Sequence, residues 1–180
     1  SIRKEWDFTI LPTNDLPKEF AELTSSIISL EEGQTLYLPS CAYGDLAIKF
    51  PQCNIVGFAE DEAVATFAQI RLDAAGIKAD ITFYPLDVSD TTVIPTDKVD
   101  AIICAAIDPI IYTALQGHTL GGMYDALKPD GKMIAICSND VFSSYKKEKS
   151  FLTRIYNDKS VDAVIQLPNN VLKDTGIAPT

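Results

Sequence analysis

Short β-rich runs alternate with amphipathic helical segments along the chain, and this alternation limits the possible folds more than any other feature of the sequence. The strand-like runs cover residues 34–38, 54–59, 81–84, 99–104, 132–137 and 161–167. The helical segments cover residues 16–30, 61–75, 120–127 and 144–157. Alternation of this kind is typical of βαβ units with right-handed crossovers. We therefore predict an α/β fold: a doubly wound, mostly parallel sheet with helices on both faces.

The helix over residues 61–75 shows how the buried faces are predicted. Its apolar side chains at three- and four-residue steps are Val64, Phe67, Ala68, Leu72 and Ala75. An acidic start complements the helix dipole, and Gly76 suits the position just after the last turn. We expect this stripe to pack on the sheet.

The length of 180 residues fits a single domain, with residues 1–30 as an N-terminal segment and helix and residues 31–180 as the α/β domain. Hydrophobic residues make up 47% and charged residues 22%, which is ordinary for a globular protein. The longest apolar runs are too short to span a bilayer, and no signal-peptide core follows the first residues. We expect a cytoplasmic protein without a membrane partner.

The four cysteines form no CxxC pair, which argues against a zinc site or a disulfide framework. They are Cys41, Cys53, Cys104 and Cys137, and we expect buried free thiols. His118 is the only histidine, so metal sites built on several histidines are excluded. The formal net charge of −10 repels a phosphate backbone. We therefore expect contact with DNA only through other domains or subunits.

Two motifs in the C-terminal half point to a family. The strand-like run at 161–167 ends in Ile-Gln-Leu-Pro at 165–168, and Thr-Gly-Ile follows at 175–177. Upstream, Leu-Lys-Pro-Asp-Gly-Lys occupies residues 127–132. Over residues 30–180 the chain resembles the adenine-N6 DNA methylases, the modification subunits of type I restriction-modification systems. The resemblance implies a Rossmann-like methyltransferase fold, S-adenosylmethionine as cofactor, and methyl transfer to a flipped adenine in DNA.

The family's cofactor turn, Asp-Pro-x-Cys-Gly-x-Gly, aligns with residues 38–44. Pro39, Cys41 and Gly44 match it and are the cofactor-binding candidates. Leu38 replaces a carboxylate that would hold the polar end of the cofactor. Ala42 places a methyl group where close approach or a positive φ is needed, and Tyr43 adds a ring to the turn. These departures argue against cofactor binding.

The acidic residue that holds the ribose in the family would stand at Ala59. Glu60 follows one place later and would serve only if the strand ends in a bulge, because a shift of one residue reverses the face of a side chain. Otherwise Glu60 and Asp61 begin the next helix favourably. Asp87 occupies the place of an acidic residue near the cofactor's adenine ring, or is an exposed loop acid.

The family's Asn-Pro-Pro-Phe or -Tyr loop binds the target amine and stacks on the flipped base. Here the fourth strand runs into Ala105, Ala106 and Ile107, which lack these groups. Asp108 and Tyr112 could form a displaced version of the loop, although Asp108 followed by Pro also suits the start of a helix.

Three hypotheses follow from these residues. The first is a catalytically degenerate methyltransferase-like domain, kept as a structural or interaction module of a restriction-modification assembly. The second is an active enzyme that uses Glu60, Asp87, Asp108 and Tyr112, and the third is an unrelated α/β enzyme acting on a small metabolite. The chain stops where family members enter their last strand, so either it is a fragment or the sheet has an open slot. An open slot favours self-association or a protein partner that adds a strand.

Overall fold

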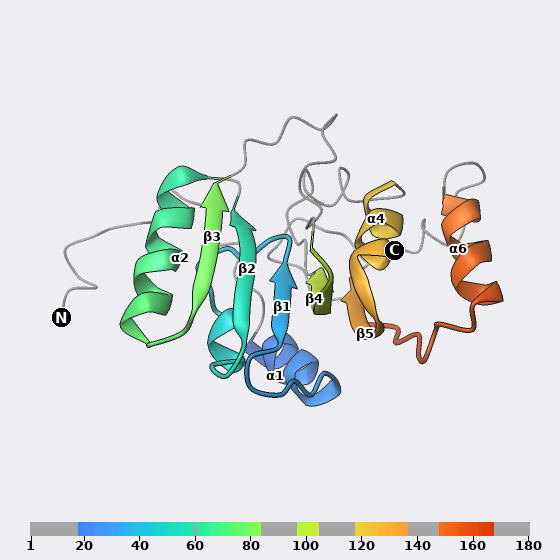
Figure 1. Cartoon of the computed structure of the whole chain (residues 1–180), viewed down its shortest axis with the longest axis horizontal. Helices are drawn as coiled ribbons and strands as arrows, with labels where there is room; N and C mark the ends of the chain where they lie inside the picture. The colour runs from blue at the N-terminus through green and yellow to red at the C-terminus, as the bar shows by residue number, and fades with distance from the viewer. Residues whose placement is uncertain (1–17, 60, 84–96, 105–117, 137–147, 168–180) are drawn as a thin grey trace.

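The computed structural model of the protein describes residues 18–59, 61–83, 97–104, 118–136 and 148–167. Five parallel strands form one sheet in the order β3-β2-β1-β4-β5 (Figure 1). They are β1 (Thr35–Leu38), β2 (Asn54–Ala59), β3 (Ala79–Phe83), β4 (Val99–Cys104) and β5 (Leu127–Ala135). The strand order reverses between β1 and β4, as expected for a doubly wound sheet. The predicted fold class is confirmed.

Helices cover both faces of this sheet. They are α1 (Lys18–Ile27), the 3-10 helix η2 (Ala47–Lys49), α2 (Glu62–Ala74), α4 (His118–Ala126) and α6 (Glu148–Asn157). One core cluster joins Leu36 and Leu38 of β1 to α1, η2 and Leu72 of α2. A second cluster joins Tyr37 to Met123 of α4. Because neighbouring strand residues point to opposite faces, the two clusters lie on the two sides of the sheet.

Helix α2 begins as predicted, but its buried face is narrower than predicted. Asp61 caps the helix by accepting hydrogen bonds from the backbone amides of Ala63 (2.8 Å) and Val64 (3.1 Å). Phe67 was predicted to be buried, yet it is 47% exposed. Its ring lies against that of Tyr43, with centroids 5.8 Å apart. The prediction from the helical period that Phe67 is buried is therefore wrong. Its ring contacts Tyr43 of the turn after β1.

Strand β5 is irregular at its start, where the Leu-Lys-Pro-Asp-Gly-Lys motif of residues 127–132 lies. Val99 of β4 pairs with Leu127, whereas Ala101 pairs with Lys132, so residues 128–131 stand outside the regular ladder. From Lys132 onward the pairing is regular. The predicted start of the fifth strand at Lys132 thus matches the regular part of the ladder.

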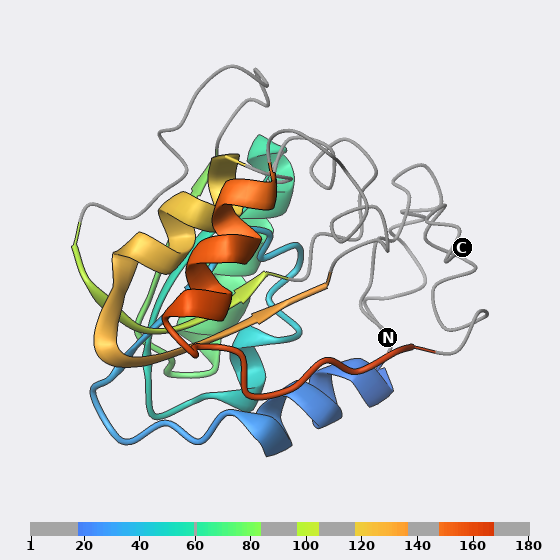
Figure 2. The same cartoon turned by 90° about the vertical axis from the view of Figure 1, so that its right-hand side faces the viewer.

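The prediction of a sixth strand over residues 161–167 is wrong. This segment pairs with none of the described strands, and Figure 2 shows it as an extended trace beyond α6. Val161, Val164 and Ile165 are 49%, 70% and 58% exposed. A strand needs a hydrogen-bonded neighbour, so apolar β-rich composition alone does not create one.

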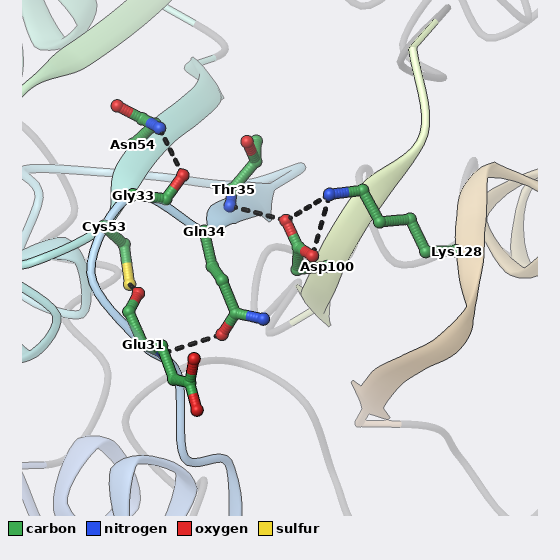
Figure 3. Close-up of polar contacts among 8 residues, drawn as sticks. All are labelled: Glu31, Gly33, Gln34, Thr35, Cys53, Asn54, Asp100 and Lys128. Carbon is green, nitrogen blue, oxygen red and sulfur yellow. Dashed lines mark hydrogen bonds and ion pairs between the residues drawn. The ribbon is translucent and has the colours of Figure 1, made fainter.

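Polar side chains cross-link the amino edge of the sheet, where the strands begin (Figure 3). The Asp100 carboxylate accepts a hydrogen bond from the Thr35 backbone amide at 2.8 Å and pairs with the Lys128 ammonium at 2.8 Å. These contacts tie β4 to β1 and to the turn at the start of β5. Burial raises the pKa of Asp100, but the hydrogen bonds from Lys128 and Thr35 outweigh it and lower the pKa below the ordinary value.

Polar contacts also join α6 to α4, which lies beside it (Figure 2). Arg154 of α6 pairs with Asp125 of α4, and its guanidinium lies 5.0 Å from the centre of the Tyr124 ring. The Tyr124 hydroxyl also lies 2.5 Å from the Ser160 hydroxyl. Exposed contacts of this kind join α6 to α4 but contribute little to the free energy of folding.

Three of the four cysteines, Cys41, Cys53 and Cys104, are buried thiols outside any disulfide, as predicted. Cys137 lies outside the described residues. Among the helices of the described ranges, none combines the length and the apolar character that a membrane crossing requires.

Candidate functional site

The carboxyl edge of the sheet at β1, β2 and β4 is where a ligand of a doubly wound fold would bind. Pro39, Cys41 and Gly44 lie there, in the turn that follows β1. The other candidates, Glu60, Asp87, Asp108 and Tyr112, lie outside the described residues, as do residues 105–107. The site can therefore be built from the turn after β1 and from the end of β2.

Backbone hydrogen bonds fix both ends of the turn after β1. The Cys41 amide donates to the Phe58 carbonyl of β2 at 2.8 Å, and the Gly44 amide donates to the Cys41 carbonyl at 2.9 Å. Gly44 has φ +82°, and a β-carbon there would lie 3.4 Å from Leu72 of α2. Glycine is therefore favoured here by the backbone conformation, whereas a β-carbon would make only an ordinary contact with Leu72.

Ala42 adopts the left-handed conformation in which a glycine is preferred. Its φ is +44°, and besides Lys159 it is the only described non-glycine residue with a positive φ. This conformation costs an L-residue about 1 to 2 kcal/mol. The position that holds glycine in the resembling family thus keeps its backbone shape with an alanine in place.

Cys41 packs against Gly57, at the centre of β2. The Cys41 side chain is buried, and a β-carbon at Gly57 would meet the Cys41 Cβ at 3.0 Å and the Ile81 Cδ1 at 2.9 Å. The absence of a side chain at Gly57 therefore lets the turn lie directly on β2. Cys41 serves this packing as a small apolar side chain.

Arg71 of α2 reaches the turn from the side. One guanidinium nitrogen donates to the Tyr43 carbonyl at 2.9 Å, and another pairs with the Asp45 carboxylate at 2.7 Å. The sequence does not predict these Arg71 contacts, because 26 to 28 residues separate Arg71 from its partners and no periodic pattern marks such a contact.

The ends of β1 and β2 carry apolar side chains where the resembling family has carboxylates. Leu38 has no exposed surface and belongs to the core cluster beneath the turn. Ala59 is 2% exposed and packs with Val64 and Ala65 of α2. The β2–β3 register is regular as far as the pair Ala59–Phe83, so the described part of β2 contains no bulge.

Tyr37 lies on the opposite face of β1 and has no exposed surface. Burial raises the pKa of its phenol well above the ordinary value, and nearby Cys104 raises it further. The Tyr37 ring also meets the Phe58 ring edge to face, with centroids 6.0 Å apart. A phenol in this environment stays neutral at physiological pH, so Tyr37 contributes packing and no charge.

The described strand ends supply no carboxylate to an S-adenosylmethionine cofactor. The sulfonium donor has a charged methionine end and a ribose with two hydroxyls, and both require polar partners. The strand ends carry Leu38, Ala59 and Cys104, and in the turn after β1 the Asp45 carboxylate is already paired with Arg71. Within the described ranges no cluster of His, Cys, Asp and Glu could hold a metal ion either.

Comparison with protein families gives a match in the C-terminal third. The model of the family described as N-6 DNA Methylase matches residues 120–180, which include most of α4 and all of β5 and α6. This match confirms the resemblance for that part of the chain. A comparison with curated proteins gave no match.

Comparison with solved structures identifies the fold. A methyltransferase from Geobacter sulfurreducens in complex with S-adenosyl-L-homocysteine is similar with a TM-score of 0.58 and 14% identity, over 92% of this chain and 72% of that one. YjhP from E. coli is similar with a TM-score of 0.57 and 12% identity, over 87% and 69%. Precorrin-6y C5,15-methyltransferase from Geobacter metallireducens is similar with a TM-score of 0.56 and 13% identity, over 82% and 76%.

At identities this low the likeness concerns the fold alone. The chain has the Rossmann-like fold of S-adenosylmethionine-dependent methyltransferases, as the motifs predicted. The strand order β3-β2-β1-β4-β5 of the described sheet is the feature that establishes this fold.

Proposed function

We propose that this domain is an adenine-N6 DNA methylase-like module that is catalytically degenerate and serves as a structural or interaction module of a restriction-modification assembly. The family-model match at residues 120–180 supports the family part of the proposal. The proposal that catalysis is lost rests on the turn after β1, where an alanine, Ala42, stands in a backbone conformation that suits a glycine. The neighbouring strand ends, Leu38 and Ala59, are buried and apolar.

An S-adenosylmethionine cofactor needs hydrogen-bond acceptors for its ribose hydroxyls. A carboxylate at the end of β2 would accept hydrogen bonds from ribose hydroxyls, and an alanine has no acceptor to offer. The methyl group of Ala42 narrows the space in which backbone amides could approach the cofactor. S-adenosylmethionine binding is therefore weak or absent in this proposal.

The sequence after β4 supports the loss of catalysis. Ala105, Ala106 and Ile107 offer no amide oxygen to a target amine and no ring to stack on a base. Removing a single transition-state hydrogen-bond donor slows an enzyme by about 10²- to 10³-fold. The loss of a whole binding loop lowers the rate further.

Calorimetric titration with S-adenosylmethionine tests the cofactor part. We expect no saturable binding by the native protein at micromolar concentrations. The double variant Ala42→Gly/Ala59→Glu restores the family's glycine and carboxylate, and we expect it to gain measurable affinity. Ala42→Gly/Ala63→Glu is the matched control, because Ala63 is exposed on α2 and receives the same charge away from the strand end. Micromolar binding by the native protein would contradict the proposal.

The alternative is an active adenine-N6 DNA methyltransferase that works with a separate specificity subunit. The family-model match favours it. Glu60 would hold the ribose, Asp87 the adenine ring of the cofactor, and Asp108 with Tyr112 the target base. This alternative requires methyl transfer to DNA that Asp108→Ala abolishes, and a lack of transfer with partner subunits present would exclude it.

The partners follow from charge and exposure. A net charge of −10 disfavours direct binding of the isolated domain to DNA, so other domains or subunits would supply that contact. The exposed segment 161–167 offers apolar side chains and backbone groups for self-association or a protein partner. Buried free thiols fit the reducing cytoplasm, where we place the protein.

A further inference from the structure

Helix α2 holds the turn after β1 through two consecutive residues. Arg71 binds the Tyr43 carbonyl and the Asp45 carboxylate, at 2.9 and 2.7 Å, and so grips the turn on both sides of Gly44. Leu72 is fully buried and packs against Gly44 itself. The turn is thus fixed by side chains of α2 as well as by its own hydrogen bonds.

The turn needs such external support because of Ala42. Alanine at φ +44° is unfavourable by itself, and the conformation persists only where the surroundings impose it. On one side of Ala42 the Cys41 amide is bound to β2. On the other side Tyr43 is the first residue bound by Arg71. Ala42 therefore stands between two anchored peptide groups.

We infer that Arg71 is the positioning residue of this turn, which holds Ala42 in the left-handed conformation that a glycine would adopt unaided. The shape of a cofactor turn then survives the loss of its glycine because α2 supplies the constraint. The inference rests on the proposed function only in treating the turn as the ligand-facing element of the site.

The chemistry of arginine suits this role. Its planar guanidinium presents several N–H groups at fixed angles, so it can bind a carbonyl and a carboxylate at once. A lysine has one nitrogen on a flexible stem and cannot hold both partners in the same geometry. An exposed ion pair alone contributes little, and the Arg71 and Asp45 side chains are 36% and 42% exposed. The Asp45 carboxylate holds the guanidinium in place for its bond to the Tyr43 carbonyl, and that bond makes Arg71 act on the turn.

Amide hydrogen exchange on the full chain tests the inference. The informative amides are those of Gly44 and Ile48, which donate to the carbonyls of Cys41 and Gly44. We expect Arg71→Gln to speed their exchange about tenfold, because the turn loses its bond to the Tyr43 carbonyl while the αL strain of Ala42 still favours opening. Arg71→Lys should give a smaller increase.

A double-mutant cycle separates positioning from general stabilisation. In an Ala42→Gly background the left-handed conformation is unstrained, so Arg71→Gln should speed exchange at Gly44 and Ile48 only about twofold. Equal increases in both backgrounds, or no increase in either, would overturn the inference. So would an equal acceleration across the β1–β2 ladder, because that would indicate a structural role only.

Two further variants complete the test. Arg154→Gln removes an ion pair of similar exposure on α6 and should leave the turn amides unchanged. Asp45→Asn weakens one of the two anchors and covers the case in which Arg71→Gln fails to fold; we expect about threefold faster exchange at Gly44. Unchanged exchange in Asp45→Asn would then overturn the inference. The measurement contains no S-adenosylmethionine, so its failure is distinguishable from failure of the proposed function.

Discussion

The two edges of the sheet are held together by different kinds of contact. At the amino edge, the Asp100 side chain binds both the Thr35 amide and the Lys128 ammonium, and so joins three strands (Figure 3). At the carboxyl edge of β1 and β2, a backbone hydrogen bond from Cys41 to Phe58 joins the turn to β2, and apolar packing around Ala59 joins β2 to α2.

This difference separates residues that serve the fold from residues that serve a ligand. Polar groups at the amino ends of parallel strands stabilise the sheet, whereas those at the carboxyl ends usually meet ligands. Here the largely covered and bound Asp100 carboxylate lies at the amino edge, and the strand ends Leu38 and Ala59 carry none. The contrast agrees with our proposal of a domain that serves folding and assembly.

Removal of the Asp100 carboxylate should have the largest effect on stability. Asp100→Ala leaves the Thr35 amide without its acceptor and the Lys128 ammonium without its counter-ion, and the Asp100 side chain is only 13% exposed. We expect the free energy of unfolding to fall by about 3 kcal/mol. Urea denaturation followed by circular dichroism measures this change.

Asp130→Ala is the matched control for this prediction. Asp130 is an exposed carboxylate in the same turn of β5, between Lys128 and the regular ladder. An exposed surface substitution should change the free energy of unfolding by less than about 0.5 kcal/mol. Equal losses in both variants would show that the amino edge is not held by Asp100.

A substitution at the carboxyl edge tests its dependence on close packing. Gly57→Ala places a β-carbon 2.9 Å from the Ile81 Cδ1 and 3.0 Å from the Cys41 Cβ, so the Ile81 side chain must shift and Cys41 must give way. We expect a loss of about 2 kcal/mol in the free energy of unfolding. Gly33→Ala is the comparison, because φ +80° strains the new residue while no atom lies within 4 Å of its β-carbon. If Gly57→Ala proves no more costly than Gly33→Ala, close packing is not the dominant constraint at Gly57.

Much of the fold could be predicted from local patterns in the sequence. β2 and β4 have the predicted bounds, because buried strands of a parallel sheet are nearly continuous apolar runs. The start of α2 was recognised from its acidic residues, and Asp61 caps it. Residues 161–167 have the same strand-like composition, but no described strand pairs with them. Composition predicts a strand, whereas pairing depends on a neighbour that local patterns do not reveal.

The site was predictable only where a motif marks it. The turn around Cys41 and Gly44 was found, and the expected need for a positive φ at Ala42 is confirmed. The Arg71 contacts and the Asp100–Lys128 pair were missed. Both join residues more than 20 positions apart, and such tertiary contacts leave no periodic signal.

The pH dependence of stability gives a smaller effect that also reports on the amino edge. The pKa of Asp100 is lowered in the folded state, so its stabilising contribution is present above the unfolded pKa of about 3.9 and is lost as the pH falls through the folded pKa. Asp100→Asn keeps the size of the side chain but removes this charge. We expect the native protein to be more stable by about 1 kcal/mol at pH 5 to 7, with the gap narrowing below pH 4. Urea denaturation of both proteins from pH 2.5 to 7 measures it, and a gap that widens on acidification would contradict the prediction.

The smallest effect on folding is expected outside the sheet, in the segment after α6. Val164 is 70% exposed, so Val164→Lys should change the free energy of unfolding by less than about 0.5 kcal/mol. The same substitution should abolish the concentration-dependent self-association that we propose, because a charge in an apolar contact between copies is costly to desolvate. Sedimentation velocity measures the association, and Thr153→Lys on exposed α6 is the control with equal charge. A native protein that stays monomeric at high concentration, or a variant that associates as the native protein does, would show that segment 161–167 is not the contact between copies.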